Sequence, residues 1–78
     1  MIAGATLPLD PLIERVSWQL GIALEQVTPL RLAEAVGVTP RTVQRWQARG
    51  RVIPAKSCDR LAVGLGWHPC VIWPEWAA

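Results

Sequence analysis

The sequence contains no Phe and no Tyr, so its five Trp residues supply all of the aromatic bulk. It has two cysteines, Cys58 and Cys70, which are too few for a disulfide framework. No uncharged apolar run approaches the roughly 20 residues that a membrane-spanning helix requires, and residues 1–9 lack the basic start of a signal peptide. We therefore expect a cytoplasmic protein in which both cysteines are reduced.

Charge is also sparse. Charged residues make up 18% of the chain and apolar residues 51%, a balance that excludes a disordered polypeptide. The length of 78 residues predicts a single domain over residues 1–78. Its ends, residues 1–9 and 75–78, are expected to be flexible.

The sequence lacks the combinations of residues that catalysis or metal binding requires. The sequence offers no paired carboxylates, no nucleophile with a neighbouring base and no phosphate-binding loop. Cys58, His68 and Cys70 supply three of the four ligands of a structural zinc ion, without the paired spacing of such sites. We therefore predict that the protein is not an enzyme and binds no metal or other cofactor.

The basic residues are concentrated in one segment. Residues 39–60 carry six Lys and Arg residues and one acidic residue, a net charge of +5, whereas the rest of the chain has a net charge of −3. A basic block within a nearly neutral domain is typical of a surface that binds a polyanion. An ordinary solvated helix face explains the charge equally well, so the surrounding pattern has to decide between the two.

Proline and glycine residues predict five short helices and no strand. A capping residue followed by proline is typical of a helix N-terminus, and apolar residues then recur at helical spacing. The predicted helix starts are Asp10-Pro11, Thr28-Pro29, Thr39-Pro40, Pro54 and Pro69. Gly21 either ends the first helix or lies within a longer one that reaches Glu25. His68 is predicted to cap the last helix.

Only residues 37–39 separate the second and third predicted helices. Such a short turn forces the two helices to pack directly, which requires a small residue such as Ala33 at the contact. Val43 and Trp46 lie three residues apart on one face of the third helix and are expected to close the core. This arrangement is a helix-turn-helix pattern.

The segment from Leu32 to Trp46 resembles the helix-turn-helix signature at about seven positions of restricted type. With the turn at 50–54 and the run Leu61-Ala62-x-x-Leu65-Gly66, residues 10–73 resemble the Cro/lambda-repressor family. The resemblance implies a compact, all-α, lambda-repressor-like domain of four to five helices without a wing. It also implies a Cro-like, sequence-specific repressor in a bacterial or phage-infected cell, associated with the nucleoid and binding DNA as a homodimer.

Two alternatives stay open. The run Thr42-Val43-Gln44-Arg45-Trp46, followed by Gly50, also resembles the excisionase and MerR type, which would make the protein an architectural DNA-binding factor. That type requires a β-hairpin wing, whereas residues 55–65 have the helical period of 3.6, so we favour the wingless interpretation. The second alternative is a protein-interaction module that uses the Trp-rich C-terminus.

The predicted recognition helix covers residues 39–49. Arg and Gln side chains form paired hydrogen bonds with guanine and adenine in the major groove, and Ala allows close approach to a thymine methyl group. The residues expected to face the bases are Arg41, Gln44, Arg45 and Ala48. The residues expected to contact phosphates are Arg31, Thr39, Thr42, Arg49, Arg51 and Lys56.

The tryptophans divide into two groups. Trp18 and Trp46 are predicted to lie in the core. A core this small does not readily accommodate five indoles, so we expect the C-terminal apolar residues to form a dimer interface. Those residues are Trp67, Val71, Trp73 and Trp76. The resemblance implies that the dimer reads two half-sites about one helical turn apart on one duplex.

Overall fold

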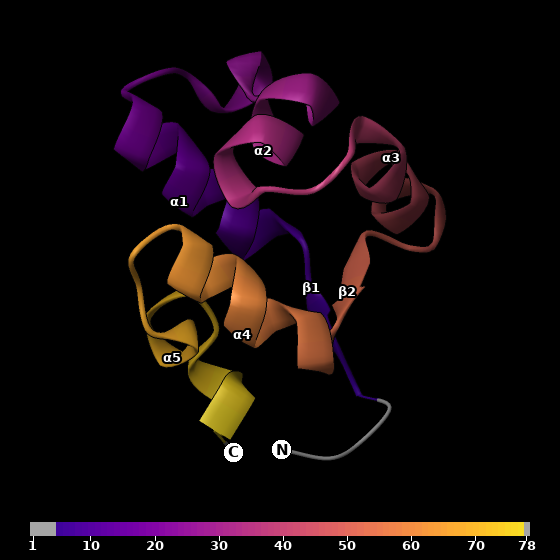
Figure 1. Cartoon of the computed structure of the whole chain (residues 1–78), viewed down its shortest axis with the longest axis vertical. Coiled ribbons are helices and arrows are strands. Elements are labelled where there is room, and N and C mark those ends of the chain that lie inside the picture. The colour runs from indigo at the N-terminus through magenta and orange to yellow at the C-terminus, as the bar shows by residue number, and fades with distance from the viewer. Residues whose placement is uncertain (1–4, 78) are drawn as a thin grey trace.

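A computed structural model describes residues 5–77 of the chain. The elements in chain order are β1 (Thr6–Pro8), α1 (Asp10–Leu20), the 3-10 turn η1 (Leu24–Gln26), α2 (Pro29–Val36), α3 (Pro40–Ala48), β2 (Val52–Pro54), α4 (Ala55–Gly64), α5 (Pro69–Ile72) and the 3-10 turn η2 (Pro74–Ala77). Helices α1, α2 and α3 occupy one half of the molecule (Figure 1). In the other half, α4 lies between the two strands on one side and α5 on the other. Of the helices in the described residues, none has both the length and the apolar character needed to cross a membrane.

The predicted helix boundaries at Thr28, Thr39 and Gly37 are confirmed. Each threonine hydroxyl accepts a hydrogen bond from the backbone N–H three residues further on, at 3.2 Å in α2 and 3.3 Å in α3. Gly37 ends α2 with a φ of 78°, a left-handed conformation that glycine adopts without strain. Gly21 has a φ of 68° and ends α1 at Leu20, so the shorter of the two lengths considered for this helix is correct.

The start of α1 differs from the prediction. Leu9 occupies the N-cap position, and no side chain caps this helix. Asp10 instead lies in the first turn, where a negative charge interacts favourably with the helix dipole. Its carboxylate accepts a hydrogen bond from the Arg51 guanidinium at 2.6 Å, and the backbone N–H of Leu9 donates to the C=O of Arg51 at 2.9 Å. These contacts join the start of α1 to the turn that follows α3.

The prediction of an all-α fold is wrong, because β1 and β2 form a two-stranded antiparallel sheet. Leu7 lies opposite Ile53 in the register, and both side chains are buried in the core. The domain is therefore a mixture of helices and strands. The two strands flank α1, α2 and α3 in the sequence and do not form a hairpin of consecutive strands.

Each strand is too short and too rich in proline to be recognised from its sequence. A three-residue strand shows almost no alternation of apolar and polar residues. Both strands end in proline, at Pro8 and Pro54, and proline lacks the N–H that a sheet requires. The pairing depends on contact between distant segments, so no local pattern announces it.

The N-terminal segment is also more structured than expected. We predicted flexibility over residues 1–9, but Leu7 and Leu9 are buried, and the N–H of Ala55 donates to the C=O of Ala5 at 2.8 Å. Residues 1–4 lie outside the described part of the chain. Within the predicted flexible C-terminus, Trp76 is half-buried and its N–H donates to the C=O of Trp73 at 2.8 Å.

The burial of Trp18 and Trp73 is the reverse of what we predicted. Trp73, expected at a dimer interface, is completely buried, and its indole N–H donates to the C=O of Pro8 at 2.8 Å. Trp18, expected in the core, is 67% exposed. Trp46 is buried as predicted. The C-terminal segment therefore completes the core against the N-terminal strand.

Candidate nucleic-acid interface

Helices α2 and α3 form the predicted helix-turn-helix unit. The N–H groups of Gly37 and Val38 both donate to the C=O of Ala33, at 2.9 and 3.0 Å. Ala33 is 1% exposed, and its small side chain allows the backbones of α2 and α3 to approach each other closely at this point. Val43 and Trp46 of α3 are buried in the same core. This packing fixes which side of α3 points outward.

The outward side of α3 carries the residues that we expected to face DNA bases. All four are exposed, and their i, i+3, i+4 and i+7 spacing places them in one stripe along the helix. They are Arg41, Gln44, Arg45 and Ala48. An α-helix with its side chains is about 10–12 Å in diameter. Helix α3 therefore fits a DNA major groove, which is about 12 Å wide.

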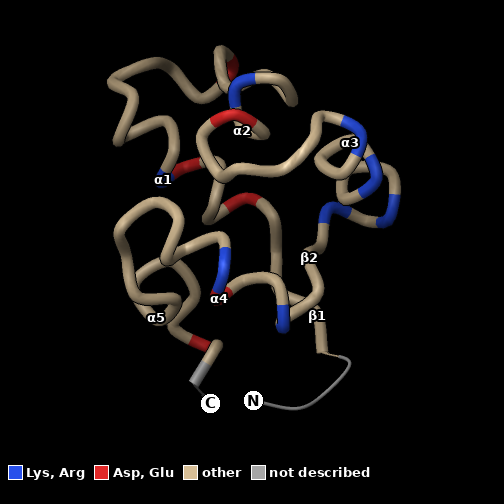
Figure 2. Tube along the Cα trace, in the orientation of Figure 1, with Lys and Arg blue, Asp and Glu red and all other residues tan. Residues whose placement is uncertain are grey.

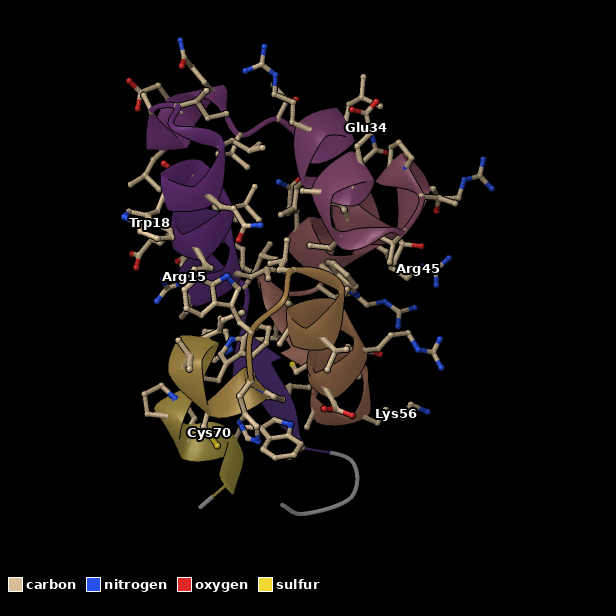
Figure 3. The ribbon with its side chains drawn as sticks, turned by 60° about the vertical axis from the view of Figure 1, so that its left-hand side comes forward. Arg15, Trp18, Glu34, Arg45, Lys56 and Cys70 are labelled. Carbon is tan, nitrogen blue, oxygen red and sulfur yellow. The ribbon has the colours of Figure 1, made fainter. Side chains whose placement is uncertain are left out.

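A groove runs beside α3, where the helix meets β2 and α4. We call it the basic groove and define it by its polar lining, which is Thr6, Thr42, Arg45, Arg49, Lys56, Ser57 and Arg60. The apolar residues that line it include the partly buried Val38 and the buried Trp46 and Leu61. Arg45 and Lys56 extend from the same side of the molecule (Figure 3). Many of the basic residues occur along α3 and on α4 (Figure 2).

The cations of the basic groove are electrostatically unsatisfied within the described residues. The single ion pair between residues 5 and 77 joins Arg51 to Asp10, on another surface of the molecule. Arg45, Arg49, Lys56 and Arg60 therefore hold four positive charges in one groove without a carboxylate within salt-bridge distance. Such a concentration of one sign attracts a polyanion.

Arg60 also lines the basic groove, although it is not among the DNA-binding residues predicted from the sequence. Within residues 5–77, neither Asp59 nor Glu34 forms an ion pair with it. Lys56 and Arg60 are four residues apart on α4, so both side chains extend from one face toward the groove. That spacing was visible in the sequence and would have identified the residue.

Three predicted phosphate contacts, Arg31, Thr39 and Arg51, lie outside the basic groove. The Arg51 guanidinium is paired with Asp10, and the residue lines a separate hollow with Gln47 and the acidic side of α1. The Arg31 guanidinium donates to the C=O of Gln26 at 3.5 Å near the start of α2. Thr39 lies at the N-terminus of α3, where its hydroxyl accepts the capping hydrogen bond and also lies 3.0 Å from the Thr42 hydroxyl.

The cysteines and the histidine do not form a site together. Cys58 lies on the buried side of α4. Burial, with a smaller effect of the Glu75 carboxylate, raises the pKa of its thiol to about 12. His68 caps α5 as predicted, since its Nδ1 accepts a hydrogen bond from the Cys70 N–H at 3.1 Å. Within residues 5–77, no three His, Cys, Asp or Glu side chains gather closely enough to hold a metal ion.

Cys58 is expected to resist alkylation by iodoacetamide at mildly alkaline pH, whereas the half-buried Cys70 is expected to react first. The thiolate is the reactive form, and burial keeps the Cys58 thiol protonated as well as covered. Timed labelling of the folded protein followed by peptide mass spectrometry measures both rates. A denatured sample is the control, in which both cysteines should react at similar rates. Equal rates in the folded protein would contradict the burial of Cys58.

The structure gathers most of the predicted DNA-binding residues on one side of the molecule. Thr42, Arg45, Arg49 and Lys56 line the basic groove, and the other exposed residues of α3 continue this surface. Comparisons of the chain with protein-family models, with curated proteins and with solved structures find no match.

Proposed function

We propose that the protein is a sequence-specific regulator of transcription that binds double-stranded DNA, with α3 as the recognition helix. The observation that carries this proposal is that the exposed α3 stripe lies beside the basic groove, whose four cations form no ion pair with any residue between 5 and 77. The resemblance of residues 10–73 to the Cro/lambda-repressor family supports a Cro-like repressor, acting at the nucleoid of a bacterial or phage-infected cell.

The α3 stripe has the chemistry needed to read bases. Arg41 and Arg45 each present a guanidinium, which forms two hydrogen bonds with the O6 and N7 atoms of guanine. The Gln44 amide forms a matching pair with the N6 and N7 atoms of adenine. Ala48 is small and exposed, so it allows the helix to approach a thymine methyl group. Because Val43 and Trp46 hold α3 in the core, this stripe is presented on a rigid element.

The basic groove provides the contacts that give affinity and orientation. Phosphate contacts by Lys and Arg position a protein on the duplex without reading its sequence. Lys56 and Arg60 on α4, with Arg49 at the end of α3, place three cations beside the recognition helix. One strand of the DNA backbone would follow this groove while α3 lies in the adjacent major groove. Arg45 lies on both surfaces and joins them.

Replacing Lys56 or Arg60 with glutamine is expected to weaken DNA binding equally for all sequences. Each substitution removes one phosphate contact, so the slope of log K against log salt concentration should become shallower by about 1. Fluorescence anisotropy of a short labelled duplex over a salt titration measures this slope. Arg15→Gln is the matched control, because it removes the same charge from the opposite side of the molecule (Figure 3). A slope that Lys56→Gln and Arg60→Gln leave unchanged would remove the basic groove from the DNA contact.

A further inference from the structure

The basic groove has an apolar lining that contact with a DNA backbone does not require. Its four cations are exposed and available to phosphates. A protein that follows the backbone of a duplex needs such cations and hydrogen-bond donors, because the backbone presents its charged phosphates outward. Five apolar residues nevertheless line the same groove, and they are Val38, Trp46, Val52, Pro54 and Leu61. This combination indicates a ligand that has both an anionic part and a less polar body.

The groove has the size of a small-molecule site. Its volume is about 750 Å³, and sites for small ligands and cofactors span about 300–1,000 Å³. Such sites combine apolar residues with a few well-placed polar groups, as this groove does. A protein partner would bury about 800 Å² on each side and would need a surface well beyond the groove.

The C-terminal residues that we predicted at a dimer interface lie mostly within the domain. Trp73 is in the core, Trp67 and Trp76 are half-buried, and Val71 is 46% exposed. The basic groove brings together exposed cations and apolar residues in one hollow, and it is therefore the stronger candidate for a further ligand.

The first turn of α4 lines one side of the groove and favours an anion there. Pro54, Lys56 and Ser57 all line the groove, and no side chain caps the N-terminus of this ten-residue helix. The first N–H groups of a helix have no partner within it, and they attract negative charge together with the helix dipole. Lys56 and Arg60 add two cations from the same helix, and α3 supplies the other two. Among residues 5–77, no Asp or Glu lines the groove.

We propose that the basic groove binds a nucleotide with two or more phosphates, and that this nucleotide competes with DNA. A single phosphate monoester carries a charge of about −1.5 to −2 at neutral pH, so it leaves roughly half of the four positive charges unbalanced. Three of the four cations are arginines. The guanidinium group binds phosphate oxygens in pairs and also stacks on planar rings, which suits both parts of a nucleotide.

The hydroxyl groups of the groove favour a sugar and a base over an alkyl chain. Thr6, Thr42 and Ser57 line the groove among its apolar residues. An alkyl chain would cover these hydroxyls without offering them a hydrogen bond, which costs free energy. A sugar and a nucleobase offer donors and acceptors at their edges, while the faces of the base pack on apolar residues such as the half-buried Val52 and Pro54.

The nucleotide site stands without the proposed function, whereas the competition with DNA rests on it. Arg45 belongs both to the groove and to the exposed stripe of α3, so a nucleotide and a duplex cannot use its guanidinium at the same time. Cations that are engaged by the phosphates of a nucleotide also no longer attract the DNA backbone. A bound nucleotide therefore lowers the affinity for DNA and makes the regulator sensitive to nucleotide concentration.

Isothermal titration calorimetry without DNA and without magnesium tests the site. The probes are adenosine triphosphate, guanosine triphosphate and inorganic tripolyphosphate. At least one nucleotide should bind about 10-fold more tightly than tripolyphosphate, which lacks the base that packs in the groove. Arg60→Gln should weaken nucleotide binding by about 10-fold, the effect of losing a hydrogen bond to a charged group. Arg15→Gln is the matched control, because Arg15 lies outside the groove, and it should leave the Kd unchanged.

A further variant tests the apolar part of the site. Val52→Ala removes an apolar contact without changing the charge, so it should weaken the binding of the nucleotide and leave that of tripolyphosphate unchanged. Equal affinities for the nucleotides and tripolyphosphate would overturn the proposal, because the groove would then attract any polyanion. The absence of saturable binding by both nucleotides would overturn it as well. Tighter binding of a tetraglutamate peptide would also overturn it and would identify the ligand as an acidic peptide.

Displacement of a fluorescent duplex, followed by anisotropy, tests the competition. The nucleotide should release the duplex at concentrations near its own Kd, and tripolyphosphate should need about 10-fold more. Gln44→Ala separates the two ligands, because Gln44 lies on the α3 stripe but does not line the groove. It should weaken DNA binding and leave the nucleotide Kd unchanged. Nucleotide binding without any DNA binding would refute the proposed function and leave the site intact, whereas DNA binding that saturating nucleotide does not weaken would refute the competition.

Discussion

Replacing Trp73 with alanine is expected to lower the free energy of unfolding by about 3–5 kcal/mol, the range for removing a buried tryptophan. The side chain is fully buried and is the largest of the completely buried residues. Its loss leaves a cavity and also leaves the C=O of Pro8 without the indole N–H that donates to it at 2.8 Å. The whole domain of 78 residues is expected to have a stability of about 4–12 kcal/mol. Trp73→Ala should therefore remove a large share of the stability of the domain.

Chemical denaturation followed by circular dichroism measures this effect. Trp18→Ala is the matched control, since it removes the same side chain from a position that is 67% exposed and should cost far less. Trp73→Phe retains most of the packing but removes the hydrogen bond to Pro8, so it should cost about 1 kcal/mol for the bond in addition to the loss of ring volume. Equal stabilities of Trp73→Ala and Trp18→Ala would contradict the burial of Trp73.

The exchange between these two tryptophans shows where sequence reasoning works and where it does not. The exposure of Trp18 was accessible from the sequence, because Leu12 and Val16 define the buried side of α1, and Trp18, two residues after Val16, falls on the other side. The burial of Trp73 was not accessible. It depends on contact with Pro8, at the far end of the chain, and no local pattern reports such a contact.

The same distinction holds for the elements. Threonine followed by proline marked the starts of α2 and α3 correctly, because capping hydrogen bonds form between neighbouring residues. The turn at Gly37 was also predicted, since its left-handed conformation is a local property. The β1–β2 pair was missed, because Leu7 and Ile53 meet only when the whole domain has folded. The capping threonines, prolines and turn glycine therefore predicted the helices. The fold class depended on tertiary contacts, which no such local signal reports.

The candidate site follows the same rule. The outward stripe of α3 could be predicted, because the helix-turn-helix packing fixes it through residues only a few positions apart. The basic groove as a whole could not, since it brings α3 and α4 together across β2. The pairing of Arg51 with Asp10 was equally hidden, because it joins the turn after α3 to the start of α1. The charge count over residues 39–60 included both Arg51 and Arg60 and could not tell the paired cation from the free one that lines the groove.

Replacing Arg45 with alanine is expected to weaken binding to the preferred DNA site by about 1–3 kcal/mol and to relax the preference at one base pair. This is roughly a 5- to 150-fold loss of affinity. The expectation follows from the proposed base contact and from the exposure of Arg45 on the α3 stripe. Selection of bound sequences from random duplex DNA, carried out on the wild type and the variant, measures the preference. Anisotropy with the selected duplex then gives the affinity.

Two further variants separate base reading from phosphate contact, because Arg45 also lines the basic groove. Arg45→Lys keeps the charge but loses the planar pair of donors, so it should keep the salt slope and lose the base preference. Arg49→Ala, at the end of the same helix, should weaken binding to all sequences equally and make the slope shallower by about 1. If Arg45→Ala behaves as Arg49→Ala does, Arg45 contacts a phosphate, and base reading falls to Arg41 and Gln44. If neither variant changes affinity at low salt, α3 is not a recognition helix, because its exposed cations then make no contact with the duplex.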